Sequence, residues 1–194
     1  MKTTKYLALA LIALINLTAC SSDDDSVPEV INEEEVITTV TLTLVPQTGE
    51  TITLTSRDLD GDGPNPPVIN VSGPLQTGMV YDGSIELLNE TVNPAEVVNE
   101  EIKEEADAHQ FFYQTDGLDA TITYADTENQ YLSNGSQNPV GIKFQLQAGT
   151  ASTGKLTVIL RHEPSKDAEG VSGGNLTNAG GESDVAQSFD VDIE

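Results

Sequence analysis

The sequence predicts a mainly β fold, an antiparallel β-sandwich of immunoglobulin-like character, and two observations support this prediction. Apolar residues alternate with polar ones along much of the chain, which is the two-residue period of a strand buried on one face. The alternating stretches are short and are separated by Gly, Pro, Asn and Asp, the residues that favour turns. Roughly nine such stretches with a polar outer face are typical of two packed antiparallel sheets.

The first two predicted strands form a hairpin. Valine, leucine and isoleucine alternate with threonine over residues 39–44 and 51–55, and Pro-Gln-Thr-Gly at 46–49 provides the turn. The last predicted strand shows one-sided burial most clearly, because its apolar residues alternate with Asp190 and Asp192. This last strand covers residues 185–193, and the other predicted strands cover 68–71, 80–88, 111–114, 120–124, 142–146 and 156–162.

One segment shows a helical period instead. Asn93 suits a helix N-cap, and Pro94 suits the first helical position. Apolar residues then recur at every fourth position over residues 98–106. The sequence therefore predicts one short crossover helix over about residues 94–107.

The N-terminus has the layout of a secretory signal peptide. Lys2 and Lys5 precede an apolar stretch of 12 residues at 6–17, which is shorter than the roughly 20 residues that span a bilayer. The following Leu-Thr-Ala-Cys resembles a bacterial lipobox, which implies removal of residues 1–19 and acylation of Cys20. The alternatives are a secreted protein with an incidental cysteine and an inner-membrane protein held by an uncleaved helix. An unpaired cysteine in an oxidising compartment would be a liability, which favours the lipid anchor.

Residues 20–35 are predicted to form a disordered tether, because they are acidic and almost free of large apolar groups. Acidic residues directly after an acylated cysteine resemble the export signal of Bacteroidota lipoproteins that reach the outer face of the outer membrane. Asp25-Ser26-Val27 also resembles the O-glycosylation sequon of that phylum, with Ser26 as the candidate acceptor. Residues 36–194 are then predicted to form one β-sandwich domain, long enough for a substantial core.

The charge balance limits the partners. The chain has 8 Lys and Arg residues against 32 Asp and Glu residues, a formal net charge of −24. Such a surface repels nucleic acid and anionic lipid head groups, so DNA and RNA binding are excluded. It suits divalent cations or basic partners, although acidity also serves simply to keep a protein soluble.

Asp58, Asp60 and Asp62 form the sharpest cation motif. Alternate aspartates around a glycine resemble the first half of an EF-hand loop, in which carboxylates converge on calcium. The twelfth position is Ile69 where a bidentate glutamate is needed, so a calcium site here would take ligands from other loops. The alternative is a polar turn between strands, with Asp and Gly chosen for backbone geometry.

The two histidines are candidate ligands for a transition metal. The predicted helix is rich in acidic residues, whose side chains repel one another. A cation near Glu105 and His109 would relieve this repulsion. His162 shares the inward parity of its predicted strand. His109, Glu105 and His162 together offer donors that zinc or copper accepts. The alternative is that each histidine is packed and hydrogen-bonded separately, because nothing in the sequence brings the two together.

No nucleophile-and-base arrangement supports an enzyme. The GxSxG match at residues 170–174 lacks the following helix that a nucleophile elbow requires. The long loop at 164–183 is either a contact surface or a mobile connection, since loops of this length are often functional. The sequence thus favours a binding or structural role over catalysis.

Several stretches together are similar to a group of short Bacteroidota (flavobacterial) lipoproteins. These proteins are often labelled "type 1 periplasmic binding fold superfamily", and the resemblance implies a cell-envelope protein. The label implies alternating strands and helices, far more helix than this sequence predicts. The resembling stretches are EEEVITTVTLTLVP, RDLDGDGPNPPVI, ELLNET, EEADAHQFFY and ILRHEPSKDAEGVSGGNLTNAGGESD.

Two functions remain open from the sequence. The first is a non-enzymatic binding or accessory module, lipid-anchored in the outer membrane and facing outward, which captures a surface ligand or assists a TonB-dependent transporter. The second is a structural or adhesive surface protein that calcium stiffens at the DxDGDG turn. Fold alone does not decide between them.

Overall fold

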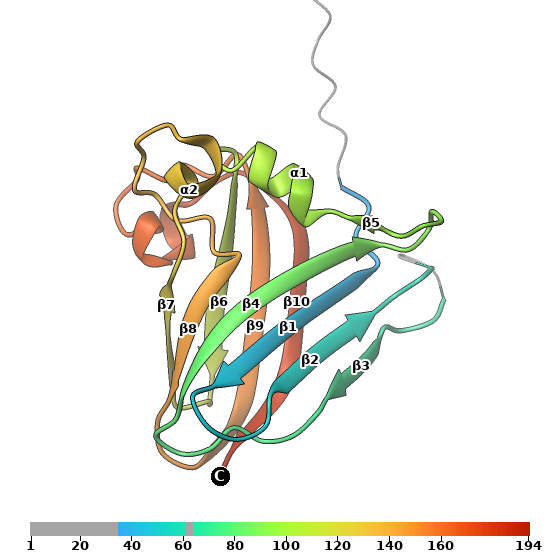
Figure 1. Cartoon of the computed structure of the whole chain (residues 1–194), viewed down its shortest axis with the longest axis vertical. Helices are drawn as coiled ribbons and strands as arrows, with labels where there is room; N and C mark the ends of the chain where they lie inside the picture. The colour runs from blue at the N-terminus through green and yellow to red at the C-terminus, as the bar shows by residue number, and fades with distance from the viewer. Residues whose placement is uncertain (1–34, 61–63) are drawn as a thin grey trace, which may run out of the picture. The chain divides into compact units, whose positions relative to one another are not determined.

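Ten β-strands, two α-helices and two 3-10 helices make up the described part of the chain, residues 35–60 and 64–194 of the computed structural model (Figure 1). The helices are α1 (Asn99–Glu104), α2 (Glu128–Leu132), η1 (Val171–Gly173) and η2 (Leu176–Asn178). None of the helices among these residues is long and apolar enough to cross a membrane. The strands are β1 (Thr39–Pro46), β2 (Ile52–Arg57), β3 (Val68–Val71), β4 (Val80–Asn89), β5 (Glu96–Val97), β6 (His109–Asp116), β7 (Ala120–Tyr124), β8 (Lys143–Ala148), β9 (Ser152–His162) and β10 (Glu182–Ile193).

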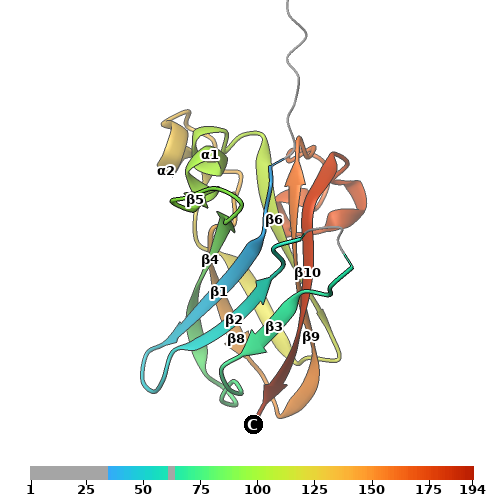
Figure 2. The same ribbon diagram turned by 90° about the vertical axis from the view of Figure 1, so that its right-hand side faces the viewer.

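The strands form two antiparallel sheets that face each other (Figures 1 and 2). A seven-stranded sheet has the order β3-β2-β1-β4-β8-β7, with β5 paired to β4, and a three-stranded sheet has the order β10-β9-β6. The predicted mainly β fold and its β-sandwich architecture are confirmed. The immunoglobulin-like character is not confirmed: immunoglobulin constant domains divide their strands about four to three between the sheets, whereas these strands divide seven to three.

One hydrophobic core lies between the sheets. Leu42 and Leu54 from the larger sheet and Leu156, Leu160 and Phe189 from the smaller one are fully buried in the same cluster. They are the inward members of the alternating stretches, and burying each such side chain contributes about 1.5–3 kcal/mol. Period-two alternation therefore identified the core correctly.

The strand boundaries differ from the prediction mainly where residues are polar. β3 and β7 have the predicted bounds, but β9 begins at Ser152 and β10 at Glu182. These two strands pair along almost their whole length, and polar cross-strand contacts such as Thr157 Oγ1 to Ser188 Oγ at 2.7 Å support the outer face. Pairing of this kind leaves no apolar signal in the sequence.

The predicted helix over residues 94–107 is much shorter in the structure. Residues 96–97 pair with β4 instead, and α1 begins only at Asn99. The buried Asn99 side chain accepts a hydrogen bond from Leu87 N at 2.6 Å and donates one to Ile85 O at 3.0 Å, so it continues the bonding along β4. Pairing with β4 thus provides hydrogen bonds for backbone groups that would otherwise have been bonded within the helix. Asn93 is not the N-cap, which is Val98.

The long loop after β9 is an ordered cover. Val171 and Ala179 pack on Phe112 and Ile159, which project from the outer face of the smaller sheet, and form a second buried cluster. The buried Lys166 ammonium pairs with Glu128 at 2.9 Å and donates to the carbonyl oxygens of residues 106 and 139 at 2.5 and 3.2 Å. These contacts fix the loop against the helices at the same end of the sandwich.

Candidate metal centre

The strand register brings the two histidines together. His109 begins β6 and His162 ends β9, and the two are direct partners in the antiparallel ladder. Both face inward, as Phe111 and Leu160 do, and their ring centroids lie 4.5 Å apart. His109 is fully buried and His162 is 6% exposed. The smaller sheet therefore places the two imidazole rings side by side.

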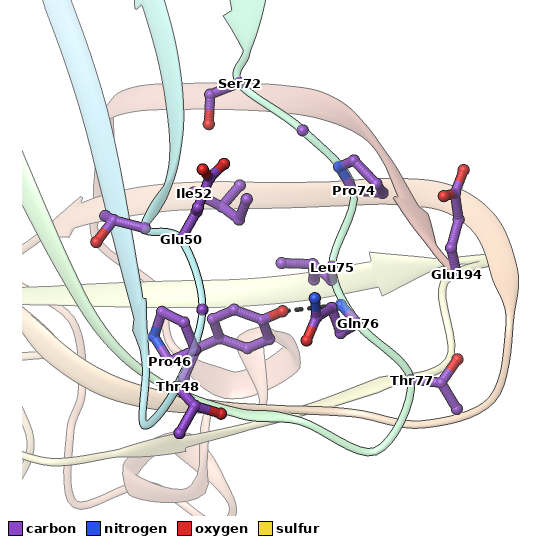
Figure 3. A pocket seen from close by; sticks show the side chains of 14 residues that line it. Pro46, Thr48, Glu50, Ile52, Ser72, Pro74, Leu75, Gln76, Thr77 and Glu194 are labelled. Atoms are coloured by element: carbon purple, nitrogen blue, oxygen red, sulfur yellow. Dashed lines mark hydrogen bonds between the residues drawn. The ribbon is translucent and has the colours of Figure 1, made fainter.

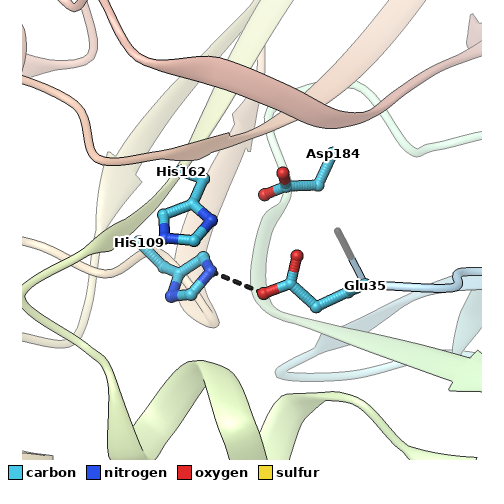
Figure 4. Close-up of side chains that lie close together, drawn as sticks. All are labelled: Glu35, His109, His162 and Asp184. Carbon is cyan, nitrogen blue, oxygen red and sulfur yellow. Dashed lines mark hydrogen bonds and ion pairs between the residues drawn. The ribbon is translucent and has the colours of Figure 1, made fainter. Parts of the chain in front are cut away.

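Two carboxylates complete the cluster. Glu35 comes from the segment that leads into β1, and Asp184 comes from β10; Figure 4 shows both carboxylates pointing toward the rings. One ligand atom from each of Glu35, His109, His162 and Asp184 lies within 4.8 Å of the other three. The Nε2 atom of His109 is 2.9 Å from Oε1 of Glu35.

A β-bulge explains how Asp184 reaches the cluster. Asp190 and Asp192, two other even-numbered residues of β10, are exposed. The pairing register shifts between Ser183 and Val185, so Asp184 is the extra residue of a β-bulge. A bulge re-aims the side chain at the extra residue, and here it turns Asp184 toward His162.

Backbone contacts orient His109. Its Nδ1 atom lies 3.1 Å from the carbonyl oxygen of Glu105, so Nδ1–H donates there and Nε2 faces Glu35. This arrangement is usual around metal-ligating histidines, where a carbonyl fixes the tautomer and the ring orientation. The ring is thus held in place before any ion binds.

The two partners shift each other's pKa. Burial by itself lowers the pKa of His109, but the hydrogen bonds to Glu35 and Glu105 and the charges of Glu35 and Asp184 outweigh it, so the pKa is raised above its ordinary value. The hydrogen bond from His109 lowers the pKa of Glu35 against the opposing effect of burial. Both shifts favour the charged forms of the pair, imidazolium and carboxylate, when no metal ion is bound.

One oxygen of Glu35 has no hydrogen-bond partner among the described residues. The side chain is 4% exposed, and Oε2 is buried without a hydrogen bond to any other residue of the described part of the chain. Leaving a buried carboxylate oxygen unsatisfied costs about 1–3 kcal/mol or more. A cation between the carboxylates and the rings would remove this cost.

The donor set fits a first-row transition metal. Imidazole nitrogen and carboxylate oxygen are donors that zinc and copper accept, at about 2.0–2.2 Å for zinc, so tetrahedral ligand atoms lie about 3.3–3.6 Å apart. The distance from Nε2 of His109 to Oε1 of Glu35 is 2.9 Å, and the four ligand atoms all lie within 4.8 Å of one another. Calcium prefers six to eight oxygens and does not suit two nitrogens.

Of the predicted transition-metal ligands, the structure brings His109 and His162 together but does not place the Glu105 carboxylate with them. His109 and His162 are brought together, whereas Glu105 contributes its carbonyl to the centre and its side chain lines an open acidic groove. The groove is lined by Glu96, Val97, Glu100, Glu101, Glu104 and Glu105. Burial, with the nearby charges of Glu35 and Glu105, raises the pKa of Glu101.

Sequence reasoning missed Glu35 and Asp184. The sequence predicts that Glu35 ends the tether, whereas the residue belongs to the compact unit Glu34–Glu194, so the folded domain begins before residue 36. The acids at 33–35 carry no pattern that separates the third from the others. Asp184 has the parity of an exposed residue, and no local signal marks the bulge.

Of the three predicted calcium ligands, Asp58 and Asp60 lie within the described residues, where they make hydrogen bonds inside the loop. Asp60 accepts hydrogen bonds from the backbone and side chain of Asn65, at 3.4 and 2.7 Å, and Asp58 accepts one from the backbone of Asp60 at 3.3 Å. These bonds are typical of a polar turn. Asp62 lies outside the described residues, as do Cys20 and Ser26.

A hollow at the opposite end of β1 has no comparable donor set. It measures about 760 Å³ and is lined by residues such as Pro46, Leu75 and Glu194 (Figure 3). Its one phenol, Tyr81, already accepts a hydrogen bond from Gln76 N at 2.8 Å. The metal centre is therefore the better functional candidate.

Comparison with known proteins gives no further guide to this centre. No protein-family model matches the chain, and neither a curated protein nor a solved structure does.

Proposed function

We propose that this protein is a lipid-anchored metal-binding module of the bacterial cell surface, which holds one divalent ion of the zinc or copper class. The ion binds Glu35, His109, His162 and Asp184. The observation that carries this proposal is the buried Glu35 carboxylate, which has one oxygen 2.9 Å from His109 Nε2 and the other without a partner among the described residues.

Charge supports a divalent ion. Two carboxylates and two neutral imidazoles carry a charge of about −2, which a divalent cation neutralises. Burying charged groups is costly unless each is paired and hydrogen-bonded, or coordinates a metal. Between these metals, a site of this kind binds copper(II) more tightly than zinc(II), so availability decides which ion it holds.

The number of donors supports binding over catalysis. Four protein ligands fill a tetrahedral coordination sphere, as in structural zinc sites, whereas catalytic sites keep one position open. This is the reason for proposing a non-enzymatic role.

The proposed location rests on the N-terminal sequence. Leu-Thr-Ala-Cys, the acidic residues after Cys20 and the similarity to Bacteroidota lipoproteins favour an acylated protein on the outer face of the outer membrane. There the acidic surface would concentrate cations around the module. A TonB-dependent transporter that takes up the ion is the kind of partner that this role requires.

Calorimetric titration of the chelator-treated protein tests the metal site. We expect one Zn²⁺ or Cu²⁺ per chain in the parent protein and no such binding in H109A/H162A. E104Q is the matched control, because Glu104 is an exposed acid in the neighbouring groove. Equal binding by H109A/H162A would refute the site. Binding of Ca²⁺ alone, lost in D58N/D60N, would instead favour a surface protein stiffened by calcium.

Intact-mass analysis and affinity capture test the location and partner. The membrane-derived protein should begin at Cys20 and carry acyl chains. A free thiol at Cys20 with the leader still attached would refute the anchor. Capture from solubilised outer membranes should recover a TonB-dependent transporter, and its consistent absence would count against that partner.

A further inference from the structure

We infer that the metal ion also acts as a clasp: its binding docks the N-terminal segment, residues 35–38, onto the three-stranded sheet. This inference rests on the proposed metal site. It assigns to Glu35 a role different from that of the other three ligands.

The four ligands come from two kinds of support. His109, His162 and Asp184 lie on the adjacent strands β6, β9 and β10, which hydrogen bonds hold together along their length. Glu35 lies outside any strand and leads into β1, which belongs to the other sheet. An ion bound to all four ligands therefore joins the segment that leads into β1 of the larger sheet to strands β6, β9 and β10 of the smaller sheet.

The N-terminal segment makes few contacts before Thr38. Within the described residues its backbone hydrogen bonds begin at Thr38, whose N–H donates to Leu88 O at 2.9 Å and whose carbonyl accepts from Asp58 N at 2.7 Å. Val36 is 54% exposed, and Ile37 is only partly buried. The Glu35 carboxylate is the polar attachment beyond Thr38, through its hydrogen bond to His109. Segments with so few contacts open locally at low free-energy cost.

Linkage makes the coupling reciprocal. If docking of Glu35 supplies the fourth ligand, docking raises the affinity for the ion by a certain factor. The bound ion then raises the equilibrium constant for docking by the same factor. With Glu35 released, the ion keeps three ligands and one open position, the arrangement that admits an outside ligand. Tension or a competing contact on the chain before Glu35 would thus weaken the binding of the ion.

Hydrogen exchange measured beside zinc titration tests the clasp. In the parent protein, Zn²⁺ should slow exchange of the amides of residues 36–38 by about tenfold or more. In E35Q, zinc should still bind on the remaining three donors, about tenfold more weakly, without slowing that exchange. E35D keeps a carboxylate and should restore part of both effects, while E104Q should match the parent.

The outcomes separate the two proposals. Zinc binding without slower exchange at residues 36–38 in the parent would overturn the clasp and leave the metal site standing. Equal zinc affinity in E35Q and the parent would also overturn the clasp, because Glu35 would not be a ligand. Absence of zinc binding in the parent would overturn the proposed function and the clasp with it.

Discussion

His109 and His162 face each other across β6 and β9 as direct register partners, with their ring centroids 4.5 Å apart. Residues opposite each other in an antiparallel pair have Cβ atoms about 4.5–5.5 Å apart. The backbone ladder therefore fixes the separation of the two imidazoles, and the carboxylates of Glu35 and Asp184 are added to that rigid pair. Four consequences of the structure can be measured.

Asp184 and Asp190 should differ in their effect on metal-induced stability. At about 100 times its Kd, an ion stabilises the folded state by about 2.7 kcal/mol, which raises the Tm by roughly 5–10 °C. D184N should lose more than half of this increase, because a ligand is removed. D190N should keep it, since Asp190 is exposed on the same strand and pairs with Lys155. Differential scanning calorimetry with and without Zn²⁺ checks this, and equal increases would contradict the ligand role of Asp184.

The buried pair Lys166 and Glu128 should matter more than the exposed pair Lys155 and Asp190. Burial lowers the pKa of Lys166 despite its bond to Glu128, and K166A leaves the buried Glu128 carboxylate without its partner. We expect a loss of about 3–5 kcal/mol in the free energy of unfolding. K155A should cost less than about 1 kcal/mol. Urea unfolding measures both, and similar losses would show that the buried pair does not anchor the loop.

Gly83 should not tolerate a side chain. It pairs with Phe144 across β4 and β8, and a Cβ atom there would overlap the Phe144 ring. G83A should destabilise the protein by about 1–3 kcal/mol, as overpacked core positions do. G173A is the control, because a Cβ at Gly173 meets nothing within 4 Å. Equal midpoints of urea unfolding for both variants would contradict the overlap.

Tyr124 should make the protein less stable at alkaline pH. Burial raises its pKa to about 12, whereas the unfolded chain releases the proton near the ordinary value of 10.0. Between these values the folded state binds more protons, so stability falls as pH rises, by up to about 2.7 kcal/mol from this residue.

Removing the phenol tests this dependence. Y124F should show a smaller loss of stability between about pH 9 and about pH 11. At neutral pH it should be less stable by about 0.5–1.5 kcal/mol, because the hydrogen bond from Tyr124 Oη to Phe111 O at 2.7 Å is lost. Urea unfolding across this range measures both, and parallel pH profiles for the two proteins would contradict the raised pKa.

Local pattern was sufficient for the strands and failed where a long-range contact competed with it. Residues 68–71 and 120–124 form the predicted strands because alternating burial is a local property. The helix over 94–107 was wrong at its start because residues 96–97 pair with β4, and Asn99 bonds to the same strand. Neither partner can be found from the helical period alone.

The sequence by itself determined the sandwich, its buried faces and the inward parity of His162. Side chains of a strand point alternately to its two faces, so each of these features appears as a two-residue period in the sequence. Tertiary structure alone decided that His109 meets His162, that a bulge turns Asp184 inward and that Glu35 joins the folded domain. Register, bulge position and the docking of a terminal segment depend on contacts between residues far apart in the chain. Such contacts leave no periodic trace in the sequence, and the metal centre consists of them.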